Sequence, residues 1–154
     1  MNPSHDWKPK KPASLAGYLE AMSRPVFSTG ISWRVVDAKW DGIREVFEGF
    51  DPERVAAIDP ADVDRLVQDP RIIRNRKKIE ATIDNAATML ALDREHDGFE
   101  KYLSSWGSFE KTVAALRRDF RFLGESGAYF FLWGVAQPVP SHEEWSETHA
   151  RRAS

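Results

Sequence analysis

The sequence contains no cysteine, which excludes disulfides, thiolate catalysis and zinc sites with cysteine ligands. It also lacks any apolar run that approaches the roughly 20 residues of a membrane-spanning helix. The first residues, Met1 to Pro12, are polar and lack the apolar stretch of a secretory signal. We therefore expect a cytoplasmic protein that does not associate with a membrane.

Motifs that bind cofactors or metals are lacking as well. The chain has no GxSxG, P-loop or dinucleotide-binding fingerprint. Its four histidines are scattered, and none lies four residues from another: His5, His96, His142 and His149. We expect no cofactor and no bound metal.

The composition indicates one folded domain with distinct ends. The 154 residues are 42% hydrophobic and 30% charged, which is typical of a globular protein. Residues 1–14 form a basic arm that we expect to be flexible, and residues 15–137 carry a helical pattern. Residues 138–154 are rich in proline and charge, so we expect a loose polar tail there.

Helical periodicity dominates residues 15–137. Asp51-Pro52, Asp59-Pro60 and Asp69-Pro70 each place an N-cap residue before a proline suited to a first helical turn, so each predicts a helix start or a turn. No stretch alternates apolar and polar residues as a strand does. The sequence predicts an all-α fold. We expect a compact bundle of short helices at residues 15–22, 32–47, 75–92, 99–103, 109–116 and 126–135, with another after Asp59-Pro60.

The net charge of −2 conceals an uneven distribution. Five positive charges lie within eight residues, with no acid among them: Arg71, Arg74, Arg76, Lys77 and Lys78. Such a run is compatible with a surface that faces phosphates. Charge runs also commonly decorate solvated helix faces, so charge by itself leaves both interpretations open.

Two local features favour a ligand site. The short connection from Asp119 to Gly124 joins two predicted helices, and a tight helical hairpin offers backbone N–H groups to a phosphate. Gly124 supplies the backbone freedom expected of such a turn. Trp33 follows the polar stretch Ser28-Thr29-Gly30, so its ring is placed to line a cavity, although tryptophan at helical spacing is more often core.

Several segments resemble the 3-methyladenine DNA glycosylase I family. Gly30-Ile31-Ser32-Trp33 is similar to the family's GLSW, and residues 120–124 (FRFLG) are similar to its FKFVG. Residues 50–57, 62–69 and 72–79 (FDPERVAA, DVDRLVQD and IIRNRKKI) complete the match. The similarity runs in one order over roughly residues 18–135. On these motifs the chain is identified as a divergent member of that family, within the helix-hairpin-helix DNA glycosylase superfamily.

The resemblance implies a substrate and a reaction. The partner would be double-stranded DNA with alkylated bases, and the reaction would hydrolyse the N-glycosidic bond of an alkylated adenine flipped into a pocket. Base binding would fall to Trp33 and Phe27, and no catalytic residue is assigned. DNA binding would fall to the basic run and the hairpin, namely Arg74, Arg76, Lys77, Lys78, Gly124, Glu125 and Ser126.

Three departures from the family concern its chemistry. Pro25 stands where the family has a glutamate that contacts the base, and a proline side chain neither donates nor accepts a hydrogen bond. The Cys and His residues that bind zinc near both ends of family members are absent. His5-Asp6-Trp7 is only a faint echo of the family's N-terminal aromatic region.

Three functions are open on the sequence. The first is a monofunctional DNA glycosylase, which Trp33 and its preceding motif favour because a plain DNA binder needs no base pocket. The second is a non-catalytic DNA- or lesion-binding protein, which Pro25 favours. The third is a helical adaptor for other proteins, which would be favoured if the basic run were paired with the chain's own acids.

Overall fold

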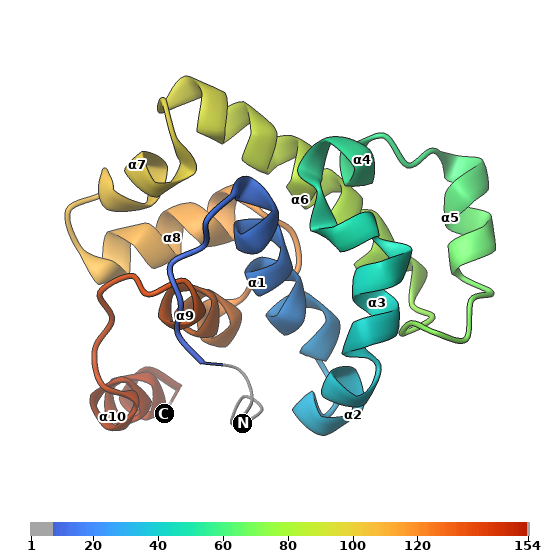
Figure 1. Cartoon of the computed structure of the whole chain (residues 1–154). Coiled ribbons are helices and arrows are strands. Elements are labelled where there is room, and N and C mark those ends of the chain that lie inside the picture. Colours follow the sequence, from blue (N-terminus) through green and yellow to red (C-terminus); the bar gives the residue numbers. More distant parts are fainter. Residues whose placement is uncertain (1–7, 154) are drawn as a thin grey trace.

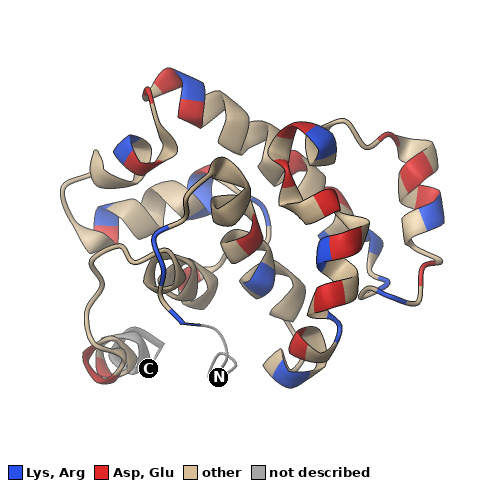
Figure 2. Cartoon of the chain, in the orientation of Figure 1, with Lys and Arg blue, Asp and Glu red and all other residues tan. Residues whose placement is uncertain are grey.

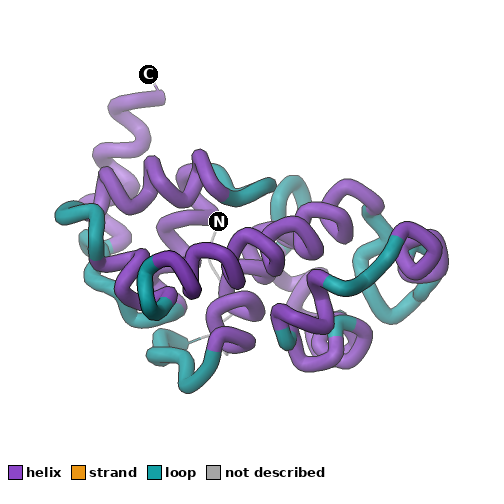
Figure 3. The backbone as a smooth tube through the Cα atoms, turned by 90° about the horizontal axis from the view of Figure 1, so that it is seen from above, coloured by secondary structure: helices purple, strands orange, loops and turns teal. Residues whose placement is uncertain are grey.

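The computed structural model describes residues 8–153, with side chains for residues 8–148. Within this range the chain forms helices and loops and no strand (Figure 3), which confirms the all-α fold. None of these helices is long and apolar enough to cross a membrane. In Figure 1 they are α1 (Leu15–Ser28), α2 (Trp33–Ala38), α3 (Trp40–Val46), the 3-10 helix η1 (Glu48–Phe50), α4 (Pro52–Ala56), α5 (Pro60–Leu66), α6 (Arg76–Glu95), α7 (Phe99–Ser104), α8 (Phe109–Asp119), α9 (Glu125–Gly134) and α10 (His142–Ala153).

Two of the three Asp-Pro pairs begin helices. Asp51 caps α4 by accepting a hydrogen bond from the Glu53 N–H at 3.1 Å. Asp59 and Asp62 form a reciprocal capping box at the start of α5. The pair at Asp69 forms a turn instead, so all three pairs act as the sequence predicts.

The sequence predicts one helix over residues 32–47, and this is wrong, because α2 and α3 are separated at Lys39. The two helices bury their tryptophans against different partners. Trp33 packs in an aromatic cluster with Phe130, whereas Trp40 stacks on Phe50 at a centroid distance of 5.5 Å. Positions 33 and 40 would share one face of a straight helix. The break therefore lets the two rings reach separate clusters.

Helices α1 and α6 connect most of the other elements of the fold. α1 packs against α9 and α6, and α6 packs against α4, α5 and α7 (Figure 1). The main core holds fully buried side chains such as Leu19, Phe47, Ile79 and Phe131. Charged residues crowd α3, α4 and α5, whereas α9 carries almost none (Figure 2). α9 is therefore an internal support, and its first turn is its charged end.

The C-terminal segment differs from the expected loose tail. Where the sequence predicts a polar tail over 138–154, residues 142–153 form α10. Trp145 anchors this helix, because it is only 6% exposed and stacks on Tyr129 at 4.5 Å. At the other end, the Lys10 N–H donates to the Gly134 carbonyl at 3.0 Å. His5-Asp6-Trp7 and the rest of residues 1–7 lie outside the described residues.

Candidate functional site

A cleft of about 530 Å³ opens between two segments that are distant in the sequence. One side, here called the α1–α2 wall, consists of residues 25–33. The other side, the hairpin wall, consists of residues 117–130 from the end of α8 through the first half of α9. The lining residues are Pro25, Ser28, Thr29, Gly30, Trp33, Arg117, Phe120, Phe122, Leu123, Gly124, Glu125, Ser126, Gly127 and Phe130.

Trp33 gives the α1–α2 wall its aromatic surface. Ser32 caps α2 by accepting from the Arg34 N–H at 3.0 Å, which starts the helix at Trp33. Gly30 has a φ of 79°, a left-handed conformation that favours glycine. The Trp33 ring meets Phe130 edge-to-face at 5.7 Å and is 7% exposed. The sequence left open whether Trp33 lines a cavity or belongs to the core. In the structure it does both, because its ring is packed on Phe130 and also lines the cleft.

Lys78 holds this wall in place from inside the protein. Its ammonium donates to the Phe27 carbonyl at 2.8 Å and to the Thr29 carbonyl at 2.5 Å. The residue is only 4% exposed, and burial lowers the pKa of its ammonium below the usual value. The expectation that Lys78 contacts DNA is therefore corrected. Its charge is used to fix the loop that precedes Trp33.

Phe27 does not reach the cleft. Its side chain is fully buried in the main core, with its ring centroid 5.9 Å from that of Phe47. It lies on the opposite face of α1 from the lining residues Pro25 and Ser28, although it is their neighbour in sequence. The structure thus contradicts the expectation that Phe27 binds a base, because a core ring has no free face for a ligand.

The hairpin wall is the surface connection that the sequence predicts between two helices. α8 ends at Asp119 and α9 begins at Glu125, and Arg121, Phe122 and Gly124 are exposed between them. Asn85 of α6 fixes the turn, because its side-chain amide accepts from the Arg121 N–H at 2.8 Å and donates to the Arg121 carbonyl at 3.1 Å. The hairpin is therefore held to α6 by the Arg121 backbone and by the ion pair of the Arg121 side chain with Asp84, and its outer surface stays open.

Asp119 strengthens the start of the hairpin. Its carboxylate accepts from the Tyr102 hydroxyl at 2.7 Å and from the Arg118 guanidinium at 2.9 Å. The pKa of Asp119 is lowered, first of all by the Arg118 hydrogen bond. Burial raises the pKa of the Tyr102 phenol, which keeps its proton for this contact. The end of α8 is thus rigidly positioned.

Gly124 serves the hairpin differently from the sequence prediction. Its φ of −82° is open to any residue, and the left-handed conformation falls on Phe122, at a φ of 57°. The backbone conformation at position 124 therefore does not require a glycine. A Cβ built on Gly124 meets nothing within 4 Å, so the missing side chain leaves open space outside the turn. As the N-cap of α9 it provides no side-chain acceptor for the first-turn N–H groups.

The structure pairs part of the basic run with the chain's own acids. Arg71 bonds to Asp69 at 2.7 Å and to Glu45 at 3.1 Å. Arg76 bonds to Asp64 at 2.5 Å. These arginines occupy exposed ion pairs, which contribute little to stability. Pairing of the basic run with the chain's own acids was the observation that would favour a protein-binding adaptor, and it holds for these two arginines.

The rest of the run is open to a partner. Arg74 and Lys77 are exposed, and no ion pair holds either of them among the side chains of residues 8–148. Lys77 lies in the first turn of α6 and Arg74 just before it, so both are close in sequence to Lys78, which bonds to Thr29. The basic run therefore serves three purposes. Arg71 and Arg76 form ion pairs, Lys78 is buried, and Arg74 and Lys77 remain exposed to solvent.

The sequence did not single out Arg117 as a site residue, yet it lines the cleft from the last turn of α8. It is exposed and has no ion-pair partner in the described part of the chain. Phe122, 36% exposed, lies near it on the hairpin. The sequence signal that could have identified Arg117 is the pair Arg117-Arg118, which lies just before the hairpin motif. Of the expected hairpin residues, Gly124, Glu125 and Ser126 all line the cleft.

The residues near the C-terminus do not fit the zinc site that the family resemblance implies. The chain has no cysteine, and among the side chains of residues 8–148 no three potential ligands gather. His142 lies among aromatic rings instead, 5.9 Å from both Phe130 and Trp145. Aromatic packing of Trp145 against Tyr129 and Phe130 holds α10 on α9.

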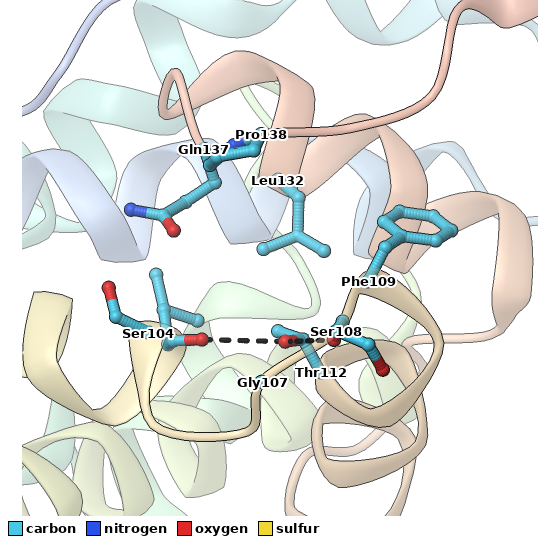
Figure 4. A pocket seen from close by; sticks show the side chains of 9 residues that line it. Ser104, Gly107, Ser108, Phe109, Thr112, Leu132, Gln137 and Pro138 are labelled. Carbon is cyan, nitrogen blue, oxygen red and sulfur yellow. Dashed lines mark hydrogen bonds between the residues drawn. The ribbon is translucent and has the colours of Figure 1, made fainter.

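A second, smaller cavity of about 250 Å³ lies between α7, α8 and the end of α9 (Figure 4). Its lining is neutral and includes Ser104, Phe109, Leu132 and Gln137. The Thr112 hydroxyl there is bonded within the protein, to the Ser108 carbonyl at 2.9 Å. The first cleft differs because it combines an exposed backbone turn, an aromatic ring and both signs of charge.

Comparison with known proteins identifies relatives of this chain by sequence and by fold. A family model described as methyladenine glycosylase matches residues 15–122. The DNA-3-methyladenine glycosylase 1 of Escherichia coli (strain K12) is 33% identical over 124 residues, 67% of this chain and 66% of that protein. A DNA-3-methyladenine glycosylase of Haemophilus influenzae is 29% identical, with 67% of each chain covered. The chain thus spans about two thirds of these curated relatives. A crystal structure of 3-methyladenine DNA glycosylase I superposes with a TM-score of 0.75 at 28% identity, covering 85% of this chain and 84% of that one.

Proposed function

The chain belongs to the methyladenine glycosylase family, and from this membership we propose that it removes alkylated adenine, of the 3-methyladenine type, from double-stranded DNA. In this reaction water adds to C1′ of the deoxyribose, and the bond from C1′ to N9 breaks with its electrons leaving on the base. A base methylated at N3 is cationic in DNA, so it departs neutral, and the water's proton passes to solvent. Such a leaving group needs little general-acid help.

The observation that carries this proposal is the cleft itself, in which Trp33 faces a helical hairpin. An enzyme that cuts the bond to a base must first take that base out of the stack and into a pocket. The electron-rich face of Trp33 favours a cationic base over a neutral one by about 0.5–2 kcal/mol. The cleft therefore supports selection of alkylated adenine on its aromatic side.

The hairpin side is suited to the DNA backbone. Open space over Gly124 lets a phosphate approach the N–H groups at the start of α9, where the helix dipole favours negative charge. Arg117 lines the same cleft, and Arg74 and Lys77 are exposed just before and within the first turn of α6. We assign phosphate contacts to these groups, so affinity for DNA should fall as salt rises.

The test is incubation of the protein with methylated duplex DNA, followed by chromatography of the released bases. We expect 3-methyladenine to be released. Trp33→Phe prepared in the same way is the control, because a contaminating host enzyme would give the same signal in both preparations. Equal release by the two proteins would therefore count against the assignment.

A non-catalytic lesion-binding protein is the second candidate, and Pro25 favours it. This residue lines the cleft and offers no polar group to a base. The same experiment separates the two functions if binding to methylated and unmethylated duplex is measured beside release. Preference for the methylated duplex without release would establish the lesion binder, and absence of both would leave the adaptor.

A further inference from the structure

The cleft holds one charged group of each sign. Arg117 and Glu125 are the charged residues that line it in the described part of the chain. A cationic base is repelled by Arg117, and a DNA phosphate is repelled by Glu125. The charges therefore suit different parts of an alkylated nucleotide, and the side chain of Glu125 is poorly suited to the phosphate clamp that its place in the hairpin suggests.

Glu125 stands at the first position of α9, close to the α1–α2 wall. A Cβ built on Gly127, in the same turn, lies 3.4 Å from the Pro25 Cβ, so this turn is in contact with the end of α1. A carboxylate at the start of a helix is stabilised in its charged form by the helix dipole. Glu125 is thus a negative charge lining the cleft, in a helical turn that packs against the end of α1.

The neighbouring hydroxyl groups are poor substitutes for this carboxylate. The Ser28 hydroxyl donates to the Arg24 carbonyl at 2.8 Å, and the Thr29 hydroxyl donates to the Pro25 carbonyl at 3.0 Å. Their protons are therefore committed to α1, and neither group carries charge. A carboxylate binds a cation or an amino group more strongly than a neutral hydroxyl does, and Glu125 is the carboxylate that lines this cleft.

We propose that Glu125 is a specificity-determining residue that contacts the flipped base. Its carboxylate accepts a hydrogen bond from the exocyclic amino group of the alkylated adenine and offsets the positive charge of the ring, while Trp33 covers the ring face. Arg117 is left for the phosphate. This role rests on the proposed function, and it moves the polar recognition of the base from α1 to the first turn of α9.

The test compares Glu125→Gln with Glu110→Gln, which alters an exposed acid in the first turn of α8, outside the cleft. Single-turnover release of 3-methyladenine from methylated duplex is measured beside affinity for a duplex with a tetrahydrofuran abasic analogue. We expect Glu125→Gln to slow release by about tenfold to a hundredfold, as for the loss of one charge-assisted hydrogen bond. Affinity for the abasic duplex, which has no base to contact, should be unchanged. Glu110→Gln should match the wild type in both measurements.

Glu125→Asp separates base contact from a structural role at the helix start. Aspartate is a good residue for a first helical turn, so full recovery of release with Asp would overturn the proposal, whereas a shorter side chain should restore release only in part. Release by Glu125→Gln at the wild-type rate would also overturn it. Absence of release by the wild type would instead overturn the proposed function, so the two failures are distinguishable.

Discussion

The two walls of the cleft are built by different means. The hairpin wall is an exposed backbone turn whose useful groups are N–H donors and the empty space over Gly124. The α1–α2 wall depends on one side chain, Trp33, which is almost fully buried. A site built from backbone tolerates many changes of side chain, whereas a site built from a packed ring does not. On the proposed function, phosphate binding at the hairpin wall should therefore be less sensitive to side-chain changes than base binding at Trp33.

One helix nevertheless positions both walls. Asn85 of α6 holds Arg121 in the hairpin by two hydrogen bonds, and Lys78, two turns earlier, holds Phe27 and Thr29. The polar residues of α6 that point inward therefore set the separation of the walls. Substitutions in α6 and in each wall show whether the two walls work independently.

The largest effect is expected at Trp33. Because the ring is 7% exposed and packs on Phe130, Trp33→Ala should lower the free energy of unfolding by about 3–5 kcal/mol. Trp33→Phe keeps most of this packing and should lower base release by about tenfold to a hundredfold, as expected for a weakened base–aromatic stack. Urea denaturation, base release and affinity for undamaged duplex are the measurements.

The comparison of the walls would fail if Trp33→Phe lost affinity for undamaged and methylated duplex in parallel with its stability. That result would make Trp33 a core residue with no separate role in the cleft.

A smaller effect is expected at Lys78, the internal support of the α1–α2 wall. Lys78→Met removes two hydrogen bonds from a charged donor to the Phe27 and Thr29 carbonyls, so the free energy of unfolding should fall by about 1–3 kcal/mol. Base release should fall with it, while affinity for undamaged duplex should change little. Lys77→Met is the matched control, because Lys77 is exposed. It should keep its stability and lose some DNA affinity, and identical behaviour of the two variants would contradict the internal role.

On the hairpin wall, Gly124→Ala should affect binding and spare the fold. The backbone conformation suits alanine and the added Cβ meets no protein atom, so stability should stay within about 0.5 kcal/mol of the wild type. The methyl group occupies the space assigned to phosphate, so affinity for every duplex should fall about tenfold, as for one lost hydrogen bond to a charged group. Fluorescence anisotropy with damaged and undamaged duplex tests this. Unchanged affinity would place the phosphate elsewhere.

The smallest effect is expected at Arg117. Arg117→Gln removes one exposed charge from the rim of the cleft, so affinity should fall alike for all sequences, and the slope of log K against log salt should decrease by about 1. Arg54→Gln on α4, where Arg54 pairs with Glu48 at 3.0 Å, is the control and should leave the slope unchanged. A slope equal to that of the wild type would remove Arg117 from the interface.

The sequence by itself determined the elements whose signals are local. Asp51-Pro52 and Asp59-Pro60 begin helices because a capping side chain and a proline act within one turn. The hairpin from Asp119 to Gly124 was likewise recognisable from its motif and its flanking helical periodicity. These interactions join residues a few positions apart, so the pattern of the chain is sufficient to locate them.

Only the tertiary structure decided which side chains meet. Phe27 lies in the core and Lys78 lies inside the protein, although both belong to segments that resemble a DNA-binding family. Trp145 anchors α10 although the sequence around it is polar. Glu125 and Pro25, one hundred positions apart, line one cleft. Burial and charge pairing depend on what lies opposite a residue, and a helical pattern specifies a face of its own helix without specifying the partner of that face.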